Sequence, residues 1–100
     1  GMGPAANIGN DFGVFEPVHG AAFEIQGKNV SNPTSILLSA RLMLQWLGAE
    51  RGDKQATLEG DRIENAILRM LTENKKTKDL GGTLTTEEFT RGVMSYLYVD

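Results

Sequence analysis

Apolar residues are concentrated in the middle and at the end of the chain, and these positions predict helices. From Ile36 to Leu47, nine of twelve residues are apolar, which predicts a helix that is covered on most of its sides. Asn32-Pro33 marks its start, because asparagine is a favoured N-cap and proline fits the first helical position. Gly48 is expected to end this helix. Residues 49–56 are then expected to form a polar linker.

Two further helices are predicted downstream of this linker. Apolar residues recur at helical spacing over about 58–73, in a stripe made of Ile63, Ala66, Ile67, Met70 and Leu71. Residues 74–82 are expected to form a loop. Thr85 and Glu88 have the spacing of a capping box, which predicts the start of a third helix. This helix is expected to bury Phe89, Val93, Met94 and Leu97.

The front of the chain is rich in glycine and carries little periodicity. Six of the twelve glycines lie at or before Gly27, and residues 3–12 are expected to form a loop. Residues 13–18 are the one plausible strand, which Pro17 restricts to an edge because proline cannot donate to a ladder. One strand cannot form a sheet, and the apolar first helix needs more cover than two helices give. We therefore expect a mostly helical part of a larger fold.

Composition excludes several classes of function. The chain has 100 residues, no cysteine, one histidine and a formal net charge of −3. Disulfides, cysteine-based zinc sites and multi-histidine metal sites are therefore excluded. Without a dense basic block, neither nucleic acid nor an anionic membrane is an expected partner. No apolar run is long enough to span a membrane and no signal peptide opens the chain, so we expect a cytoplasmic protein.

One loop, from His19 to Thr34, carries the side chains that a nucleoside needs. An imidazole can stack on a base, glycines allow close approach of the backbone, and the Glu24 carboxylate can bind ribose hydroxyls. Composition alone leaves a different reading open for each residue. A single histidine before a glycine, or an acidic residue in a loop, is more often structural or simply solvated.

At these positions the sequence resembles the isocitrate/isopropylmalate dehydrogenase family of NAD(P)-dependent β-decarboxylating dehydrogenases. The resemblance covers essentially the whole chain. It rests on six ordered blocks: Gly-Met-Gly-Pro-Ala-Ala-Asn-Ile-Gly at 1–9, Phe-Glu-Pro-Val-His-Gly at 15–20, Gln-Gly-Lys-Asn-Val-Ser-Asn-Pro-Thr at 26–34, Ser-Ala-Arg-Leu-Met-Leu at 39–44, Asp-Leu-Gly-Gly-Thr at 79–83, and Thr-Glu-Glu-Phe-Thr at 86–90. Each block is moderately specific, and their order and spacing together are strong evidence.

The resemblance implies a cofactor-binding role for nine residues, which are Glu16, His19, Gly20, Ala21, Ala22, Glu24, Ile25, Asn32 and Asp79. In the family pattern, His19 and Gly20 lie at the adenine side of the dinucleotide and Asn32 meets the adenine edge. Glu16 lies near the end that carries the nicotinamide ribose. No catalytic residue and no metal ligand is expected within this chain.

The choice between NAD and NADP follows from Glu24, which occupies the family's discriminating position. A carboxylate can accept hydrogen bonds from both ribose hydroxyls but repels a 2′-phosphate. Ile25 replaces the tyrosine typical of NADP enzymes, and Gly82 has no side chain with which to bind a phosphate. Lys78 is the one residue here that could. Two departures from the pattern are Phe23, in place of a usual proline, and the extra methylene of Glu24. NAD is the expected cofactor.

Family members are over three times longer, so we interpret residues 1–100 as one partial domain, the C-terminal part of the NAD-binding domain. The parent fold is α/β and like that of isopropylmalate dehydrogenase; this part should be mostly α, with about three helices, one or two short strands and a glycine-rich loop. The implied activity is oxidative decarboxylation of a 2-hydroxy acid of the 3-isopropylmalate or isocitrate type. Mg²⁺ or Mn²⁺ would be bound by residues outside the chain, and a homodimer is expected. The isolated chain should be inactive. The alternative is a stand-alone helical interaction or nucleotide-binding module.

Overall fold

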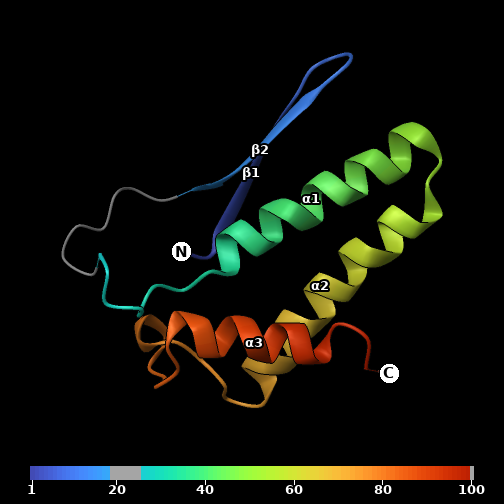
Figure 1. The fold of residues 1–100 in the computed structure, drawn as a ribbon. Helices are drawn as coiled ribbons and strands as arrows, with labels where there is room; N and C mark the ends of the chain where they lie inside the picture. The colour runs from blue at the N-terminus through green and yellow to red at the C-terminus, as the bar shows by residue number, and fades with distance from the viewer. Residues whose placement is uncertain (19–25, 100) are drawn as a thin grey trace.

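The computed structural model describes residues 1–18 and 26–99, and this part of the chain is mostly helical (Figure 1). Its elements in order are β1 (Gly3–Ile8), β2 (Gly13–Val18), α1 (Thr34–Arg51), α2 (Lys54–Thr72), the short 3₁₀ turn η2 (Lys78–Leu80) and α3 (Thr86–Tyr96). The expected three helices with one or two short strands are confirmed for the described residues.

The front of the chain forms an antiparallel hairpin, so the expectation of a loop over residues 3–12 is wrong for 3–8, which form β1, and confirmed for 9–12, which connect the two strands. β1 pairs with β2 from Gly3 opposite Val18 to Ile8 opposite Gly13. The turn is closed by a hydrogen bond of 2.7 Å from the Gly9 N–H to the Phe12 carbonyl oxygen. β1 is rich in small residues with little strand preference, and its conformation is set by pairing with β2.

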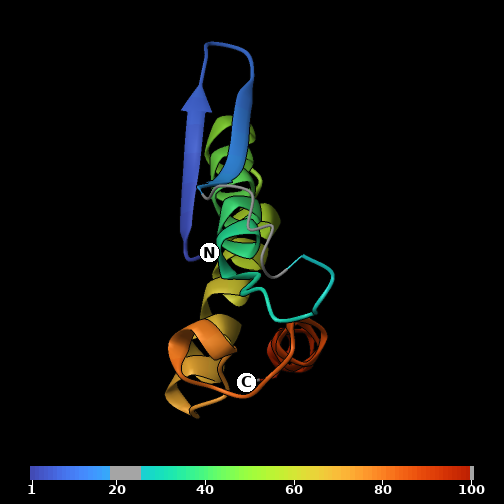
Figure 2. The same cartoon turned by 90° about the vertical axis from the view of Figure 1, so that its left-hand side faces the viewer.

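The elements pack in a series, with α1 between the hairpin and α2 (Figures 1 and 2). On the hairpin side, the Phe15 ring meets the Trp46 ring at a centroid distance of 5.9 Å and an angle of 51°. α3 packs against α2 at the opposite end of the series. Asn29 and Ser31, in the segment before α1, hydrogen-bond to the start of α3.

α1 is less covered than its apolar sequence predicts. Its fully buried positions hold small or polar residues, namely Thr34, Ser35, Ser39 and Gly48. Ile36 and Met43 are 51% and 39% exposed, because within the described residues α1 meets only the hairpin and α2. The expectation of a helix covered on most sides is therefore not met by this part of the chain.

Gly48 does not end α1, and the predicted polar linker over 49–56 is almost entirely helical. α1 continues to the left-handed Gly52, whose φ is 62°. α2 then starts directly after Asp53, whose carboxylate accepts the N–H groups of Gln55 and Ala56. A Cβ atom at Gly48 would overlap the Thr57 hydroxyl and lie 3.0 Å from the Asp53 carbonyl oxygen. The role of this glycine is therefore close helix packing.

The apolar core lies between α2 and α3. Its buried side chains are Ala66, Ile67, Met70, Phe89 and Val93, with Leu97 packed beside them. The predicted capping box of α3 is confirmed, because the Glu88 N–H donates to the Thr85 hydroxyl and the Thr85 N–H to the Glu88 carboxylate. The prediction that Met94 is buried is wrong. Its side chain is 63% exposed, since it lies off the stripe that faces α2.

The close approach at Gly48 gives a stability prediction. Gly48→Ala should lower the free energy of unfolding by about 1–3 kcal/mol, because the added methyl group meets backbone that cannot move independently. Ala49→Ser, on the exposed side of the same turn, should change it by less than about 0.5 kcal/mol. Urea denaturation followed by Trp46 fluorescence and circular dichroism measures both. Equal stability of the two variants would contradict this account of the α1–α2 contact.

Candidate functional site

Asn32 is the centre of a hydrogen-bonded cluster just before α1, and its side chain is only 5% exposed. Its Oδ1 accepts the Thr34 N–H at 3.0 Å and the Thr34 hydroxyl at 2.6 Å. Its Nδ2 donates to the Asp79 carboxylate and to the Met2 sulfur, each at 3.1 Å. An amide side chain has two donors and an acceptor with two lone pairs. The hydrogen-bonding capacity of the Asn32 side chain is therefore fully used.

The predicted start of the first helix differs from the structure by one residue. α1 begins at Thr34, and Pro33 occupies the position before it. Asn32 still provides the capping interaction that its sequence position predicts, because its side chain accepts the Thr34 N–H. Its backbone carbonyl oxygen accepts a hydrogen bond from the Gly1 nitrogen at 2.9 Å. The start of α1 is thus fixed through both the side chain and the backbone of Asn32.

Asp79 joins this cluster to the turn η2. Its second carboxylate oxygen accepts the hydroxyl of the fully buried Thr77 at 2.5 Å. Partial burial acts to raise the pKa of Asp79, but the hydrogen bonds from Thr77 and Asn32 lower it more, so the net pKa is below the ordinary value. Asp79 is therefore a carboxylate at neutral pH, and it supplies the acceptor that the Asn32 Nδ2 needs.

The loop before Asn32 is fastened to the N-terminus of α3 (Figure 1). The Asn29 carbonyl oxygen accepts the Thr86 N–H at 3.0 Å, and its side-chain oxygen accepts the Glu87 N–H at 3.1 Å. The Thr86 hydroxyl donates to the Ser31 carbonyl oxygen at 2.5 Å. Asn29 has a φ of 57°, a left-handed conformation that asparagine adopts more readily than most residues. Residues 29–32 are thus held by two elements distant in the sequence.

The structure brings together two of the nine residues predicted to bind the cofactor, Asn32 and Asp79. Glu16 lies on the exposed face of β2, opposite Ala5, and none of the hydrogen bonds in the described part of the chain joins it to Asn32 or Asp79. The other six predicted residues lie outside the described residues: His19, Gly20, Ala21, Ala22, Glu24 and Ile25.

The sequence reasoning missed three residues that hold this cluster, Asn29, Thr34 and Thr77. A local signal existed for Thr34. In an Asx turn an asparagine side chain accepts a hydrogen bond from the backbone two residues further on, and Thr34 lies at that distance from Asn32. Asn29 has no such signal, because its partners at the start of α3 lie up to 58 residues away along the chain. The hydrogen bond of Thr77 is local, since its partner Asp79 lies two residues further on.

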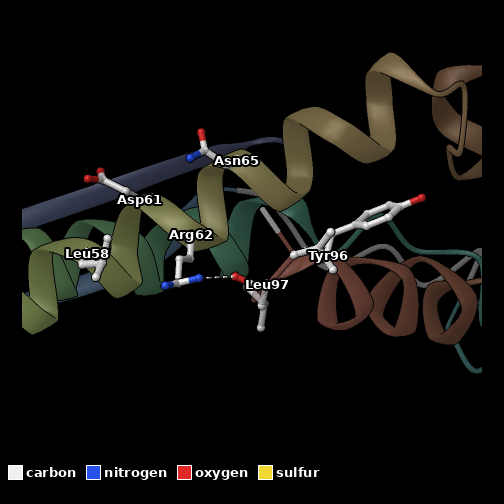
Figure 3. A pocket seen from close by; sticks show the side chains of 7 residues that line it. Leu58, Asp61, Arg62, Asn65, Tyr96 and Leu97 are labelled. Carbon is white, nitrogen blue, oxygen red and sulfur yellow. Dashed lines mark hydrogen bonds between the residues drawn. The ribbon is translucent and has the colours of Figure 1, made fainter.

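A hollow of about 410 Å³ lies at the C-terminal end of α3, against α2 (Figure 3). Leu58, Asp61 and Arg62 line it from α2, and the Arg62 guanidinium donates to the Leu97 carbonyl oxygen at 3.2 Å. No group of three acidic or histidine residues in the described ranges could hold a metal ion. Within residues 1–18 and 26–99, no helix has both the length and the apolar character needed to cross a membrane.

Comparison with known proteins identifies the class. The family model for isocitrate/isopropylmalate dehydrogenase matches residues 1–93. The chain is 44% identical over 97 residues to a 3-isopropylmalate dehydrogenase of Archaeoglobus fulgidus, covering 97% of this chain and 28% of that protein. An isocitrate/homoisocitrate dehydrogenase of Thermus thermophilus is also 44% identical over 97 residues, with coverage of 97% and 27%.

The fold agrees with this match. A crystal structure of a beta-decarboxylating dehydrogenase from Thermococcus kodakarensis superposes with a TM-score of 0.80 at 34% identity, covering 94% of this chain and 26% of that one. The chain therefore belongs to the isocitrate/isopropylmalate dehydrogenase family. It spans about a quarter of the length of the relatives it matches, and its mostly helical structure is a fragment of their α/β fold.

The contact between Asn32 and Asp79 predicts a pH-dependent variant. Asn32→Asp replaces the Nδ2 donor by a second carboxylate beside Asp79. Repulsion between the two carboxylates raises the pKa of one of them above its value in the unfolded chain. The resulting loss of stability should be about 2 kcal/mol at pH 7 and should shrink as the pH falls toward 4, because protonation restores a donor.

Urea denaturation at pH 4 and pH 7 measures this difference. Asn65→Asp is the matched control, since Asn65 is exposed on α2, and its effect should be within about 0.5 kcal/mol at both pH values. A loss for Asn32→Asp that is the same at both pH values would show that the two side chains are not coupled.

Proposed function

We propose that this chain is the adenosine-binding part of an NAD-dependent β-decarboxylating dehydrogenase that acts on a 2-hydroxy acid. The observation that carries the proposal is the hydrogen-bonded cluster around Asn32, a residue that the family pattern aligns with the adenine edge. We call the backbone at Asn32 and the side chains bonded to it the junction. Two distant elements, η2 and the start of α3, hold this junction in place. A site that recognises a flat base needs such a fixed polar edge.

The bonding of Asn32 decides which of its groups would meet the base. All hydrogen-bonding positions of its side chain are used by Thr34, Asp79 and Met2. Recognition of adenine therefore falls to the backbone at this position. Its N–H is a donor, and its carbonyl oxygen, which accepts from the Gly1 nitrogen, has a second lone pair. The Asn32 side chain would thus hold the Asn32 backbone in place, and the backbone would form the hydrogen bonds to adenine.

NAD is favoured over NADP by charge and by space. Glu24, aligned with the family's discriminating position, would accept hydrogen bonds from the ribose hydroxyls and repel a 2′-phosphate. Gly82 aligns with a position where some NADP-using members carry a phosphate-binding arginine. A Cβ atom there would overlap the carbonyl oxygen of Lys76. This turn has no room for such a side chain unless its backbone moves.

The remaining chemistry belongs to parts of a full-length relative that this chain does not contain. When bound, NAD would supply the hydride acceptor for the oxidation of the 2-hydroxy acid. A divalent ion, Mg²⁺ or Mn²⁺, held by residues outside this chain, would supply a Lewis acid for the loss of CO₂. The described residues supply no cluster for that ion, so the role of this chain is to bind and orient the adenosine half of the cofactor. We further propose that the whole protein is a cytoplasmic homodimer.

A second candidate function, self-association as a helical module, is favoured by one observation. Apolar side chains of the hairpin and α1 are exposed, among them Val14, Val18 and Ile36 at 50%, 61% and 51%. Light scattering across a range of concentrations separates the candidates. An oligomer that grows with concentration and does not bind NAD favours the helical module. A monomer that binds NAD favours the dehydrogenase.

The cofactor choice gives a direct prediction. In titrations followed by ¹H–¹⁵N NMR, NAD and ADP-ribose should shift amide signals near Asn32, with NADP at least about tenfold weaker, a difference of about 1.4 kcal/mol. Glu24→Lys should reduce or reverse this preference. Glu50→Lys, an equal charge change on the exposed surface of α1, should leave it unchanged. Equal affinity of the unmodified chain for NAD and NADP would contradict the proposal.

A second prediction concerns catalysis. The purified chain should show no reduction of NAD with 3-isopropylmalate or isocitrate, because we expect the metal site and the acid–base groups to lie in parts of a full-length relative outside residues 1–100. When it replaces the matching quarter of the Archaeoglobus fulgidus enzyme, the chimaera should regain NAD-dependent turnover. Turnover by the isolated chain would refute the assignment to a cofactor-binding part. A folded chimaera that is inactive and does not bind NAD would refute the proposed function.

A further inference from the structure

The Asp79 carboxylate bridges two buried side chains on different elements. Its two oxygens accept from the Asn32 Nδ2 at 3.1 Å and the Thr77 hydroxyl at 2.5 Å. The turn that carries it is itself fixed, because the Thr77 carbonyl oxygen accepts the N–H groups of Leu80 and Gly82 at 3.1 and 3.0 Å. Asp79 therefore offers a carboxylate at a defined position beside the start of α1.

A carboxylate selects one of the two orientations of the Asn32 amide. Because it can only accept hydrogen bonds, the NH₂ end of Asn32 must face Asp79, and the oxygen must then face Thr34. In the flipped orientation the amide oxygen would face the carboxylate, and the Thr34 N–H would lose its acceptor. Each buried group left unpaired is costly. Asp79 thereby fixes the same amide that caps α1.

We propose that Asp79 is a positioning residue for the adenosine site, which holds the Asn32 amide in one orientation and so fixes the backbone that meets the base. This inference rests on the proposed function, and it differs from a direct contact between Asp79 and the cofactor. Its distinguishing consequence is that geometry, not charge, matters at this position. A neutral side chain that keeps both hydrogen bonds should preserve binding.

The experiment compares three variants by ¹H–¹⁵N NMR, with ADP-ribose as the probe. Asp79→Asn can accept from the Asn32 Nδ2 and donate to the Thr77 hydroxyl, and in this arrangement the Thr34 N–H keeps its acceptor, so the variant should keep the affinity within about threefold. Asp79→Ala removes both contacts, and we expect at least about tenfold weaker binding. Asp61→Ala removes an exposed aspartate on α2 and should bind like the unmodified chain.

The side-chain NH₂ signals of Asn32 give a second readout that does not depend on the ligand. In the unmodified chain and in Asp79→Asn they should be one sharp pair, and in Asp79→Ala they should move or broaden as the orientation is released. Unchanged Asn32 NH₂ signals in Asp79→Ala would overturn the positioning role. Equal losses of affinity in Asp79→Asn and Asp79→Ala would overturn it too, since they would indicate a need for the charge.

Two further outcomes are distinguishable. If the unmodified chain shows no shifts with ADP-ribose, the proposed function fails, and the Asn32 NH₂ signals alone decide whether Asp79 orients the amide. If Asp79→Ala does not fold, Thr77→Val serves in its place, because it releases only one oxygen of the carboxylate. A loss of about threefold, together with a change in the Asn32 signals, is then expected, and no change in either overturns the inference.

Discussion

The structure around the candidate site depends on one side-chain amide with no free hydrogen-bonding position. The two ends of the Asn32 amide face opposite partners, the start of α1 on one side and η2 with the N-terminal segment on the other. Because these partners come from three parts of the chain, the hydrogen bonds of the Asn32 amide form only when the tertiary structure forms. Its burial makes it costly to leave any of these bonds unmade.

The apolar core and the polar hydrogen bonds of Asn29 and Asn32 fix different parts of the structure. The core between α2 and α3 fixes where α3 lies, and α3 in turn presents its first N–H groups. Thr85 satisfies one of them through the capping box, and Asn29 satisfies two more. Backbone donors at a helix start normally need outside partners. Here the loop supplies them, so the same contacts complete the helix and hold the loop.

Local signals predicted most of the helical structure. The capping box at Thr85 and Glu88 was correct, because its whole pattern lies within four residues. The start of α1 was predicted to within one residue for the same reason. Gly48 was misread, since a glycine at a helix end and a glycine at a close helix contact are alike in sequence. Only the position of Thr57 on α2 separates the two readings.

Only part of the cluster around Asn32 could be predicted from the sequence, because Asn29, Thr34 and Thr77 were missed and the contacts between distant residues were not predicted. Asn32 and Asp79 both followed from the family resemblance, yet nothing in the sequence pairs residues 47 positions apart. β1 was missed on similar grounds, because its conformation depends on pairing with β2 and not on its own composition. Both failures concern interactions between segments, to which periodicity and capping patterns do not respond.

The register of the hairpin has a consequence for how other strands can approach it. Pro4 lies directly opposite Pro17, and since neither can donate, this pair must be one whose backbone groups point away from the partner strand. Both outer edges of the ribbon therefore lack an N–H donor at the same level. An added strand would meet this interruption on either side, and edges broken in this way resist uncontrolled edge-to-edge aggregation.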